Sequence, residues 1–322
     1  MQLKISEYRA NKLKTRATGV TSVVVRMALL YAIAFTIAYP ILFMFVSTFR
    51  SGADLYNPSV VWITRNFTLD NLKYIYDFMS YPKLLAYTLL ISGVSALLQV
   101  FSCGLAGYGF ARYRFRGRTV LFIIVMFSLI IPVQTYITPL YMAFRNFNIP
   151  VVTQIISLFS SGNGTMNLID NPFAFWVQSI LGMGLRSGLF IFIFRQFYAN
   201  MPKEFDDAGR IDGCGHFGIY FKIMLPNATA AITVVFIFSF VWHWNDYFTT
   251  SVLSTNASTL ATALSTLRNT MWNLDPNTAN DVLLQQVRIQ AGALLCILPL
   301  LILFVVMQKF ITESVEKTGI VG

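Results

Sequence analysis

The chain has 322 residues, of which 56% are hydrophobic and only 12% are charged, and its mean hydropathy is +0.60. Soluble domains carry about 25% charged residues, so this composition excludes an ordinary soluble globule. A helix needs about 20 apolar residues to cross the hydrocarbon layer of a bilayer, and several stretches approach that length. The composition therefore predicts an all-α membrane protein whose spans contact membrane lipid.

The net charge of +10 does not indicate a nucleic-acid surface. The basic residues are dispersed among apolar runs of membrane length, and the positive-inside rule accounts for them better. We therefore expect no nucleic acid among the partners. Cys103, Cys214 and Cys296 are odd in number and lack metal-ligand spacing, so we expect neither a disulfide framework nor a metal site.

Six apolar stretches are predicted as membrane spans, at residues 27–48, 84–110, 120–141, 175–197, 228–252 and 289–310. An even number of crossings places both termini on the same side of the membrane. Lys and Arg cluster before the first span, between the second and third, and after the fourth. Because such clusters mark cytoplasmic segments, we expect both termini to be cytoplasmic.

This topology divides the chain into four parts. Residues 1–26 form a cytoplasmic N-terminal tail, since the apolar run behind them is too long for a signal peptide. Residues 27–83 hold the first span and an extracytoplasmic loop, in which turn residues alternate with aromatics and predict short helices. Residues 84–310 form the transmembrane core, with a cytoplasmic loop at 198–227, and residues 311–322 form a cytoplasmic C-terminal tail.

The loop at 198–227 has the pattern of two short helices joined by a turn. Pro202 suits the first turn of a helix, and three carboxylates follow near its positive N-terminal end, at Glu204, Asp206 and Asp207. Glycines at 213 and 215 end this helix. A second helix then carries an apolar stripe at i, i+3, i+4 and i+7, formed by Phe217, Tyr220, Phe221 and Met224. Leu225 precedes a proline, which predicts a bend into the next span.

Within this loop, DAGRIDGCGHFGIYFKIMLP resembles the E-A-A-x3-G-x9-I-x-L-P signature of bacterial ABC importer permeases. The resemblance implies that the loop docks onto an ATPase and acts as the coupling helix. The residues that it marks for docking are Glu204, Asp207, Ala208, Gly209, Asp212, Gly213, Phe217, Leu225 and Pro226. Two positions depart from the signature, since Asp207 replaces its glutamate and Gly209 its second alanine. The alternative is an amphipathic loop on the lipid surface, which would be richer in Lys and Arg.

The resemblance extends over nearly the whole chain. The segments NFTLDNLKYIY, ARYRFRGR, IIPVQTYITPLY, FIFRQFYANMPKE, FVWHWNDY and EKTGIVG resemble sugar-importer permeases of the maltose type, and in particular the G-type subunit. This implies the type I ABC importer fold, in the bacterial cytoplasmic membrane, for sugar or oligosaccharide import. It also implies as partners a second homologous permease, two ATPase subunits and an extracytoplasmic solute-binding protein. The C-terminal tail of the G-type subunit reaches toward the ATPases, which marks Thr318, Gly319 and Gly322, although a frayed terminus is an equal alternative.

A carbohydrate path is predicted near the fourth and fifth spans. Arg186 and Asp246 fall within apolar runs, where an ionisable group is expensive unless it faces a polar cavity. The resemblance adds to the path Ser239, Trp242, His243 and Asn245, and the third span adds Gln134 next to a kink at Pro132. The alternatives are a structural Arg186–Asp246 ion pair, an interfacial aromatic belt and a core histidine. The partner permease could also be the subunit that holds the sugar.

No catalytic constellation is present, and the chain lacks the GxxxxGK[ST] loop that cradles phosphates. We therefore expect no enzyme activity and no cofactor in this chain, with ATP and Mg bound by the partner ATPase. Two other functions remain open. One is an ABC permease for a non-sugar solute such as a polyamine, and the other is a secondary transporter, which would show an inverted repeat or broken helices.

Overall fold

The computed structural model describes residues 2–60, 62–148, 166–255 and 258–319 of the chain. These residues form helices and contain no β-strand, and their only β-pairing consists of two isolated bridges, Arg50 with Phe67 and Phe147 with Met166. The predicted all-α class is confirmed. The chain divides into two compact units, residues 1–74 with 280–294 and residues 75–279 with 295–322, which are described separately.

The first unit contains the long helix α1 (Gln2–Thr48), the short α2 (Gly52–Leu55), the start of α3 (Asp70–Phe78) and the start of α17 (Val282–Gly319). Helix α1 begins within the predicted N-terminal tail, so the tail and the first span form one helix. Helix α17 likewise continues through the predicted C-terminal tail as far as Gly319. The short helices predicted for the first loop are present as α2 and α3.

A buried carboxylate organises this loop. Asp54 accepts hydrogen bonds from the backbone N–H of Asn66 at 2.7 Å and from its side-chain amide at 3.0 Å. The Asn71 amide donates to the carbonyl oxygens of Thr48 at 3.1 Å and Arg50 at 2.8 Å. The bonds from Asn66 favour the charged form of the carboxylate and lower the pKa of Asp54. Two side chains thus fold the loop back onto the end of α1.

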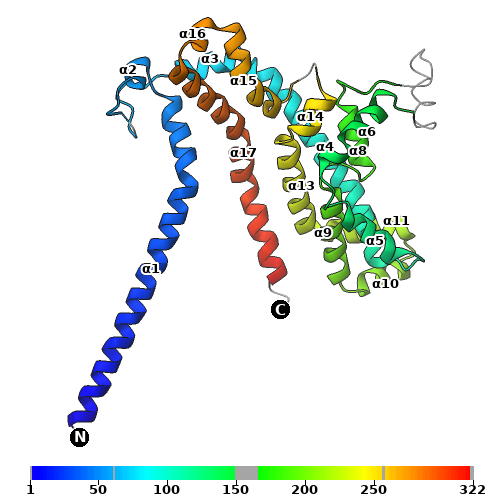
Figure 1. The fold of residues 1–322 in the computed structure, drawn as a ribbon. Helices are drawn as coiled ribbons and strands as arrows, with labels where there is room; N and C mark the ends of the chain where they lie inside the picture. The colour runs from blue at the N-terminus through cyan, green and yellow to red at the C-terminus, as the bar shows by residue number, and fades with distance from the viewer. Residues whose placement is uncertain (1, 61, 149–165, 256–257, 320–322) are drawn as a thin grey trace. The chain divides into compact units, whose positions relative to one another are not determined.

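In the second unit, α4 (Tyr81–Arg112) packs against α9 (Ser187–Asn200), α13 (Thr229–Trp244) and α8 (Phe173–Ile180), as Figure 1 shows. Glycine permits the closest of these contacts. A Cβ atom at Gly107 would lie 2.5 Å from the Phe194 Cβ and 2.9 Å from the Arg195 backbone nitrogen. The α4 and α9 backbones therefore approach more closely there than any larger residue allows.

Three described helices are long and apolar enough to cross a membrane, Ser22–Thr48, Tyr81–Arg112 and Val282–Phe310. They correspond to the predicted first, second and sixth spans. The other three predicted spans are each divided in two. Residues 120–141 fall in α5 (Arg118–Phe127) and α6 (Val133–Arg145), residues 175–197 in α8 and α9, and residues 228–252 in α13 and α14 (Phe248–Leu253).

Each interruption has a local cause. Pro132 lacks an N–H and disfavours helix in the residue before it, so α6 starts afresh behind it. Gly182 and Arg186 adopt positive φ angles of 68° and 58°, which no α-helix tolerates. Asp246 accepts hydrogen bonds from the Thr249 N–H at 3.1 Å and the Thr250 hydroxyl at 3.3 Å, so its carboxylate caps the start of α14.

Helix α15 (Leu260–Leu274) lies beside the first half of α4, where the Leu260 N–H donates to the Thr88 hydroxyl at 2.9 Å. It starts with a reciprocal capping box between Thr259 and Thr262, and it is followed by α16 (Pro276–Ala279). The indole N–H of Trp244 donates to the Cys296 carbonyl at 3.2 Å. This bond joins α13 to the part of α17 that belongs to this unit. Cys296 also carries one of the three free thiols.

The Gly107 contact makes a prediction that two alanine substitutions on the same helix can test. Gly107→Ala should lower the free energy of unfolding by about 1–3 kcal/mol, because the new methyl group meets backbone atoms that cannot move aside. Gly93→Ala is the matched control, since nothing lies within 4 Å of its Cβ position. It should gain up to about 1 kcal/mol from helix propensity. Thermal unfolding of the purified assembly measures both, and equal melting temperatures would contradict the close contact.

Candidate functional site

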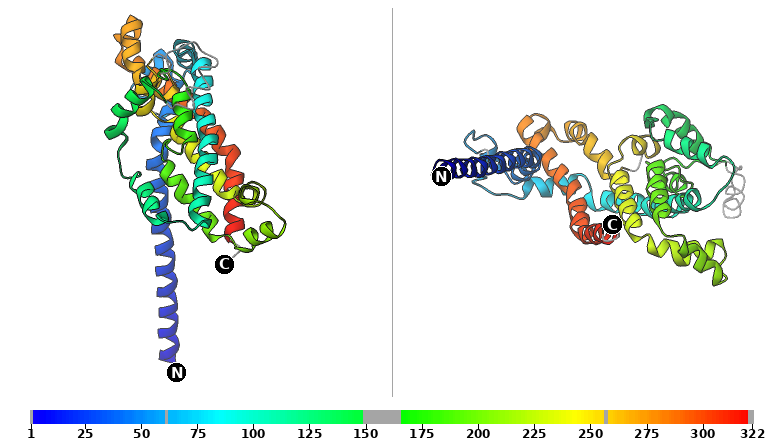
Figure 2. Two further views of the ribbon diagram at one scale, coloured as in Figure 1. Left: turned by 90° about the vertical axis from the view of Figure 1, so that its right-hand side faces the viewer. Right: turned by 90° about the horizontal axis from the view of Figure 1, so that it is seen from below.

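The loop at 198–227 has the predicted helix-turn-helix form. Helix α10 (Glu204–Ile211) is followed by α11 (His216–Ile219), a π-helix η1 (Tyr220–Met224) and α12 (Leu225–Asn227). Gly213 has a φ of 74° and open space around its Cβ position, so the turn needs glycine for its backbone conformation rather than for room. The axis then bends by 79° into α13, and the segment projects away from the spans in Figure 2.

The second half of the loop differs from the predicted apolar stripe. Tyr220 and Met224 are fully buried, whereas Phe217 is 70% exposed and Phe221 is 42% exposed. Phe217 and Phe221, four residues apart, share the exposed side, and Tyr220 and Met224, also four residues apart, share the buried side. Phe217 therefore points to solvent, away from the core that holds Tyr220.

The loop is rooted in the core of the second unit. Ile219, Tyr220 and Met224 belong to the same buried cluster as Phe194 and Tyr198 of α9. Gly209 lets α10 lie against this root, since a Cβ there would be 2.9 Å from the Ile219 side chain and 2.7 Å from that of Ile223. The glycine that replaces the alanine of the signature thus allows a closer contact between the two loop helices.

A buried ion pair anchors α10 to the end of α4. The Asp206 carboxylate lies 3.3 Å from the Arg112 Nε and accepts a hydrogen bond from the Tyr108 hydroxyl at 3.1 Å. The Arg112 guanidinium also donates to the Met201 carbonyl at 2.7 Å and the Pro202 carbonyl at 3.2 Å. Two residues of α4 therefore fix both the start of α10 and the turn before it.

The opposite side of α10 is free. Glu204, Asp207, Ala208 and Ile211 are exposed and recur at i, i+3, i+4 and i+7, so they share one face of the helix. Ile211 is 86% exposed, and Phe217 of α11 adds a second exposed apolar side chain. We call these five residues the docking face. It combines carboxylates with two large apolar groups, which is typical of a surface that a protein partner covers.

The other docking residues predicted from the sequence have structural roles. Gly213 makes the turn, Gly209 makes the helix contact, and Leu225 is half-buried at the root of the loop. Asp212 and Pro226 are exposed. Of the tail residues, Thr318 and Gly319 lie at the end of α17, and Gly322 lies outside the described residues.

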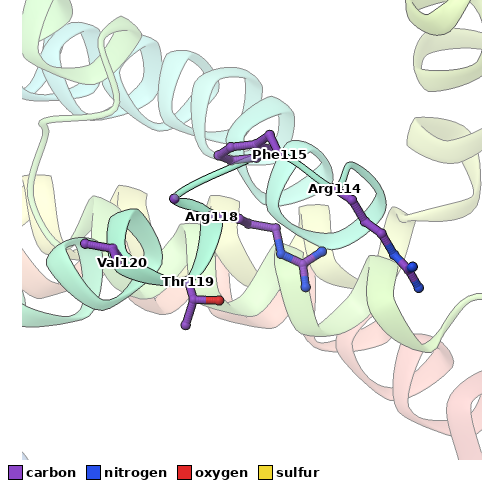
Figure 3. A pocket seen from close by; sticks show the side chains of 6 residues that line it. Arg114, Phe115, Arg118, Thr119 and Val120 are labelled. Carbon is purple, nitrogen blue, oxygen red and sulfur yellow. The ribbon is translucent and has the colours of Figure 1, made fainter.

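Two hollows adjoin the loop. One, of about 410 Å³, lies between α4 and α10 and is lined by both charges, among them Arg112, Lys203, Asp206 and Arg210. The other, of about 480 Å³, lies at the turn between α4 and α5. There the side chains of Arg114 and Arg118 extend in the same direction, and Phe115 lies on the other side of the turn (Figure 3). The end of this unit that carries the loop is thus charged and recessed beside the docking face.

The residues predicted for the solute path fall into two groups. In the first, the Arg186 guanidinium lies 5.8 Å from the ring centre of Trp242, which also contacts Phe190 and Phe238. The Tyr136 hydroxyl of α6 is within electrostatic reach of both Arg186 and Asp246. The interruption of the fourth span therefore lies beside α13, and α14, which follows the interruption of the fifth span, contacts α6. Both Arg186 and Asp246 lie in the described part of the chain, and they do not form an ion pair within 4 Å.

The second group does not share one surface. Ser239 and His243 are buried and face Gln99 of α4, with the His243 Nε2 3.2 Å from the Gln99 Oε1. Asn245 is exposed and donates to the Val241 carbonyl at 2.9 Å, and Gln134 is also exposed. Ser239 and His243 therefore lie between α4 and α13.

Several functional residues escaped sequence reasoning. Asp206, rather than Asp207, is the anchored carboxylate. The sequence signal for this anchor was the presence of Tyr108 and Arg112, four residues apart, at the end of an apolar span. Ile211 was recognisable as an apolar residue on an acidic helix face. Gln99 was recognisable as a polar side chain in the middle of a predicted span, where burial requires hydrogen-bond partners.

Interrupted membrane helices that gather polar side chains, joined to a rooted loop with an exposed docking face, define a membrane permease subunit. Comparisons with known proteins are consistent with this class. Residues 103–317 match the family described as the binding-protein-dependent transport system inner membrane component. This match covers more than half of the chain, which therefore belongs to this family and is a multi-pass component of the plasma membrane.

Related proteins cover nearly the same length. An arabinooligosaccharides transport system permease, AraQ of Halalkalibacterium halodurans, is 28% identical over 296 residues, covering 90% of this chain and 93% of that protein. The maltodextrin transport system permease MdxG of Bacillus subtilis is 26% identical over 292 residues, covering 90% and 93%. A crystal structure of a bacterial ABC transporter involved in alginate import matches with a TM-score of 0.64 and 21% identity over 89% of this chain and 95% of that one. The type I permease fold is thereby supported.

The anchor of α10 can be separated from its docking face by two aspartate substitutions. Asp206→Ala removes the partner of a largely buried arginine and should weaken the attachment of α10 by about 1.5–3 kcal/mol. Hydrogen exchange of the amides at 204–211 should accelerate accordingly. Asp207→Ala, which removes an exposed carboxylate one residue further on, should leave the exchange rates unchanged. Equal exchange in both variants would contradict the anchoring role.

Proposed function

We propose that this chain is a permease subunit of an ATP-driven ABC importer for a sugar or oligosaccharide. The observation that carries the proposal is a loop whose inner side is buried in the transmembrane core while its outer side is free for a partner. Family membership supports an import system with a binding protein. The names of the related arabinooligosaccharide and maltodextrin permeases support a carbohydrate as the solute.

The proposed assembly follows from these features. This chain pairs with a second homologous permease, two ATPase subunits that hold ATP and Mg, and an extracytoplasmic solute-binding protein. It crosses the membrane six times with both termini in the cytoplasm, the third, fourth and fifth crossings being interrupted helices. Interrupted backbone at membrane depth requires protein or water around it, and the second permease and the solute cavity provide both.

The proposed coupling uses the loop as a rigid connection. When ATP closes the ATPase dimer, the docking face moves with its ATPase. Because Tyr220 and Met224 are buried against α4 and α9, the displacement passes to these helices without bending the loop. The interruptions of the membrane helices are the points where the backbone can adjust, so the cavity opens to the opposite side.

The proposed solute contacts are Arg186, Trp242 and Asp246, with Tyr136 at the edge. A guanidinium and a carboxylate donate to and accept from sugar hydroxyls, and an indole packs against the apolar face of a sugar ring. Ser239 and His243 contribute indirectly, through their contacts with Gln99, which hold α13 on both sides of Trp242. Gln134 and Asn245 are exposed and polar, and we assign them to the wall of the path.

Binding of the ATPase tests the docking face. Phe217→Asp should weaken copurification of the ATPase about 30-fold or more, because it places a charge at an exposed apolar anchor. Gly213→Trp should act in the same direction, since tryptophan cannot adopt the positive φ without strain. Ile63→Asp is the control, as an 82% exposed residue of the first loop that lies outside the docking face. Unchanged ATPase binding by Phe217→Asp would reject the proposed docking.

Uptake into vesicles by the reconstituted importer tests the solute contacts. Asp246→Ala should reduce uptake of maltodextrins or arabinooligosaccharides about tenfold, with the ATPase still bound, because hydrogen bonds to charged groups contribute about 1.5–3 kcal/mol. Since Asp246 also caps α14, Asp246→Asn is needed as a companion that keeps a capping side chain and removes the charge.

If Asp246→Asn transports normally while Asp246→Ala does not, the carboxylate serves the helix and not the sugar. Release of the ATPase by Asp246→Ala would contradict the separation of solute path and docking loop. Transport of a polyamine, with no uptake of any oligosaccharide, would replace the proposed substrate class.

A further inference from the structure

The side-chain amide of Gln99 is completely buried at the centre of α4 and uses its full hydrogen-bonding capacity. Its Nε2 donates to the Leu185 carbonyl at 2.9 Å and to the Ser187 hydroxyl at 2.8 Å. Its Oε1 accepts from the Ser239 hydroxyl and lies 3.2 Å from the His243 Nε2. One amide thus joins α4 to the interruption of the fourth span and to α13.

The pattern of bonds also fixes the histidine. The Gln99 amide nitrogen faces a carbonyl oxygen, which can only accept, so its Oε1 must face α13. His243 therefore carries its proton on Nε2 and donates to Gln99. Its Nδ1 is an acceptor and has no partner among the described residues. Gln99 therefore accepts hydrogen bonds from two side chains of α13, and it donates hydrogen bonds to two groups at the start of α9.

The residue between the two acceptors on the fourth span is Arg186. It adopts the left-handed conformation, with a φ of 58°, which costs a non-glycine residue about 1–3 kcal/mol and persists only where surrounding contacts enforce it. Gln99 holds the residues on both sides of it. Gly184 admits the amide, since a Cβ there would lie 2.6 Å from the Gln99 Nε2.

The strained backbone directs the Arg186 side chain over Trp242. The other half of the Gln99 network holds α13 at Ser239 and His243, which flank Trp242 along the helix. The same amide therefore fixes the backbone on each side of the guanidinium and of the indole. Neither side chain touches Gln99 in any contact described above, so its influence on them is indirect.

We propose that Gln99 is a positioning residue for the solute site, which holds Arg186 in its left-handed conformation and so sets the guanidinium over Trp242. The inference rests on the proposed function, because Arg186 and Trp242 are the solute contacts assigned there. Gln99 itself contacts no solute. Its loss should weaken the apparent affinity for the sugar while leaving the docking loop and the ATPase in place.

A first experiment measures position without transport. Hydrogen exchange is followed at the amides of residues 184–189 in the assembled importer. Gln99→Met, which keeps the side-chain length and removes all four bonds, should accelerate this exchange at least tenfold. Ser102→Ala is the matched control, since it removes another bond from α4, donated to the Ser179 carbonyl at 2.7 Å, before the interruption. Unchanged exchange in Gln99→Met would overturn the inference.

A second experiment measures the consequence for uptake. Gln99→Met should raise the apparent KM for the oligosaccharide about three- to tenfold, with little change in maximal rate or ATPase copurification, as expected for interhelical hydrogen bonds of about 0.6–1.7 kcal/mol. Gln99→Glu, which accepts but cannot donate to Leu185, should behave similarly. Ser102→Ala should retain the wild-type KM.

A double-mutant cycle then decides whether Gln99 acts through Arg186. In an Arg186→Ala background, Gln99→Met should add no further increase in KM. A multiplicative effect of the two substitutions would overturn the positioning role and leave the proposed function intact. If the unmodified importer takes up no oligosaccharide, the proposed function is rejected instead. The hydrogen-exchange experiment then still tests whether Gln99 holds the backbone around Arg186.

Discussion

The close packing of α4 against α9 and α13 is the constraint on which the other features of the second unit depend. Helix α4 contains the residues that make these contacts, namely Gln99, Gly107, Tyr108 and Arg112. They are spaced along about 20 Å of the helix, from the middle of the unit to the docking loop. At its middle α4 holds the interruption beside Arg186, and at its C-terminal end it holds Asp206 of α10. Both regions are attached to a single continuous helix.

The sequence was most informative where function requires an unusual local pattern. Proline, carboxylates and glycines in the loop at 198–227 predicted two helices and a turn, and the structure contains them. The same patterns did not predict the exposure of Phe217. All four positions of the predicted stripe are apolar, so periodicity alone could not show that Tyr220 and Met224 face the core while Phe217 and Phe221 face outward.

The interruptions were less accessible to sequence reasoning, because hydropathy averages over about 20 residues and cannot register a break of three to six. Pro132 and Gly182 were visible signals. The break at Arg186 had no such signal, because its left-handed backbone is imposed by Gln99, which lies 87 positions away in the chain. Of the residues predicted for a solute path, Arg186 and Asp246 were singled out by the cost of an ionisable group in lipid, whereas the burial of Ser239 and His243 against Gln99 was visible only in the structure.

Broken membrane helices are also a feature of secondary transporters, where half-helix ends form ion and solute sites. Their presence here shows that interrupted helices alone do not distinguish the two classes of transporter. The distinguishing feature is the loop, since a secondary transporter has no need of a projecting docking face rooted in the core. The family assignment agrees with the loop.

The interruptions near residues 128–132, 181–186 and 245–247 have a consequence for biosynthesis. In the isolated chain they carry exposed polar side chains, those of Ser128, Arg186 and Asn245, which hydrocarbon cannot solvate. A newly inserted, unassembled copy therefore presents these polar side chains to lipid until another subunit covers them. Membrane quality control recognises such defects, so the cellular lifetime of this chain should be set by the supply of the subunit with which it assembles.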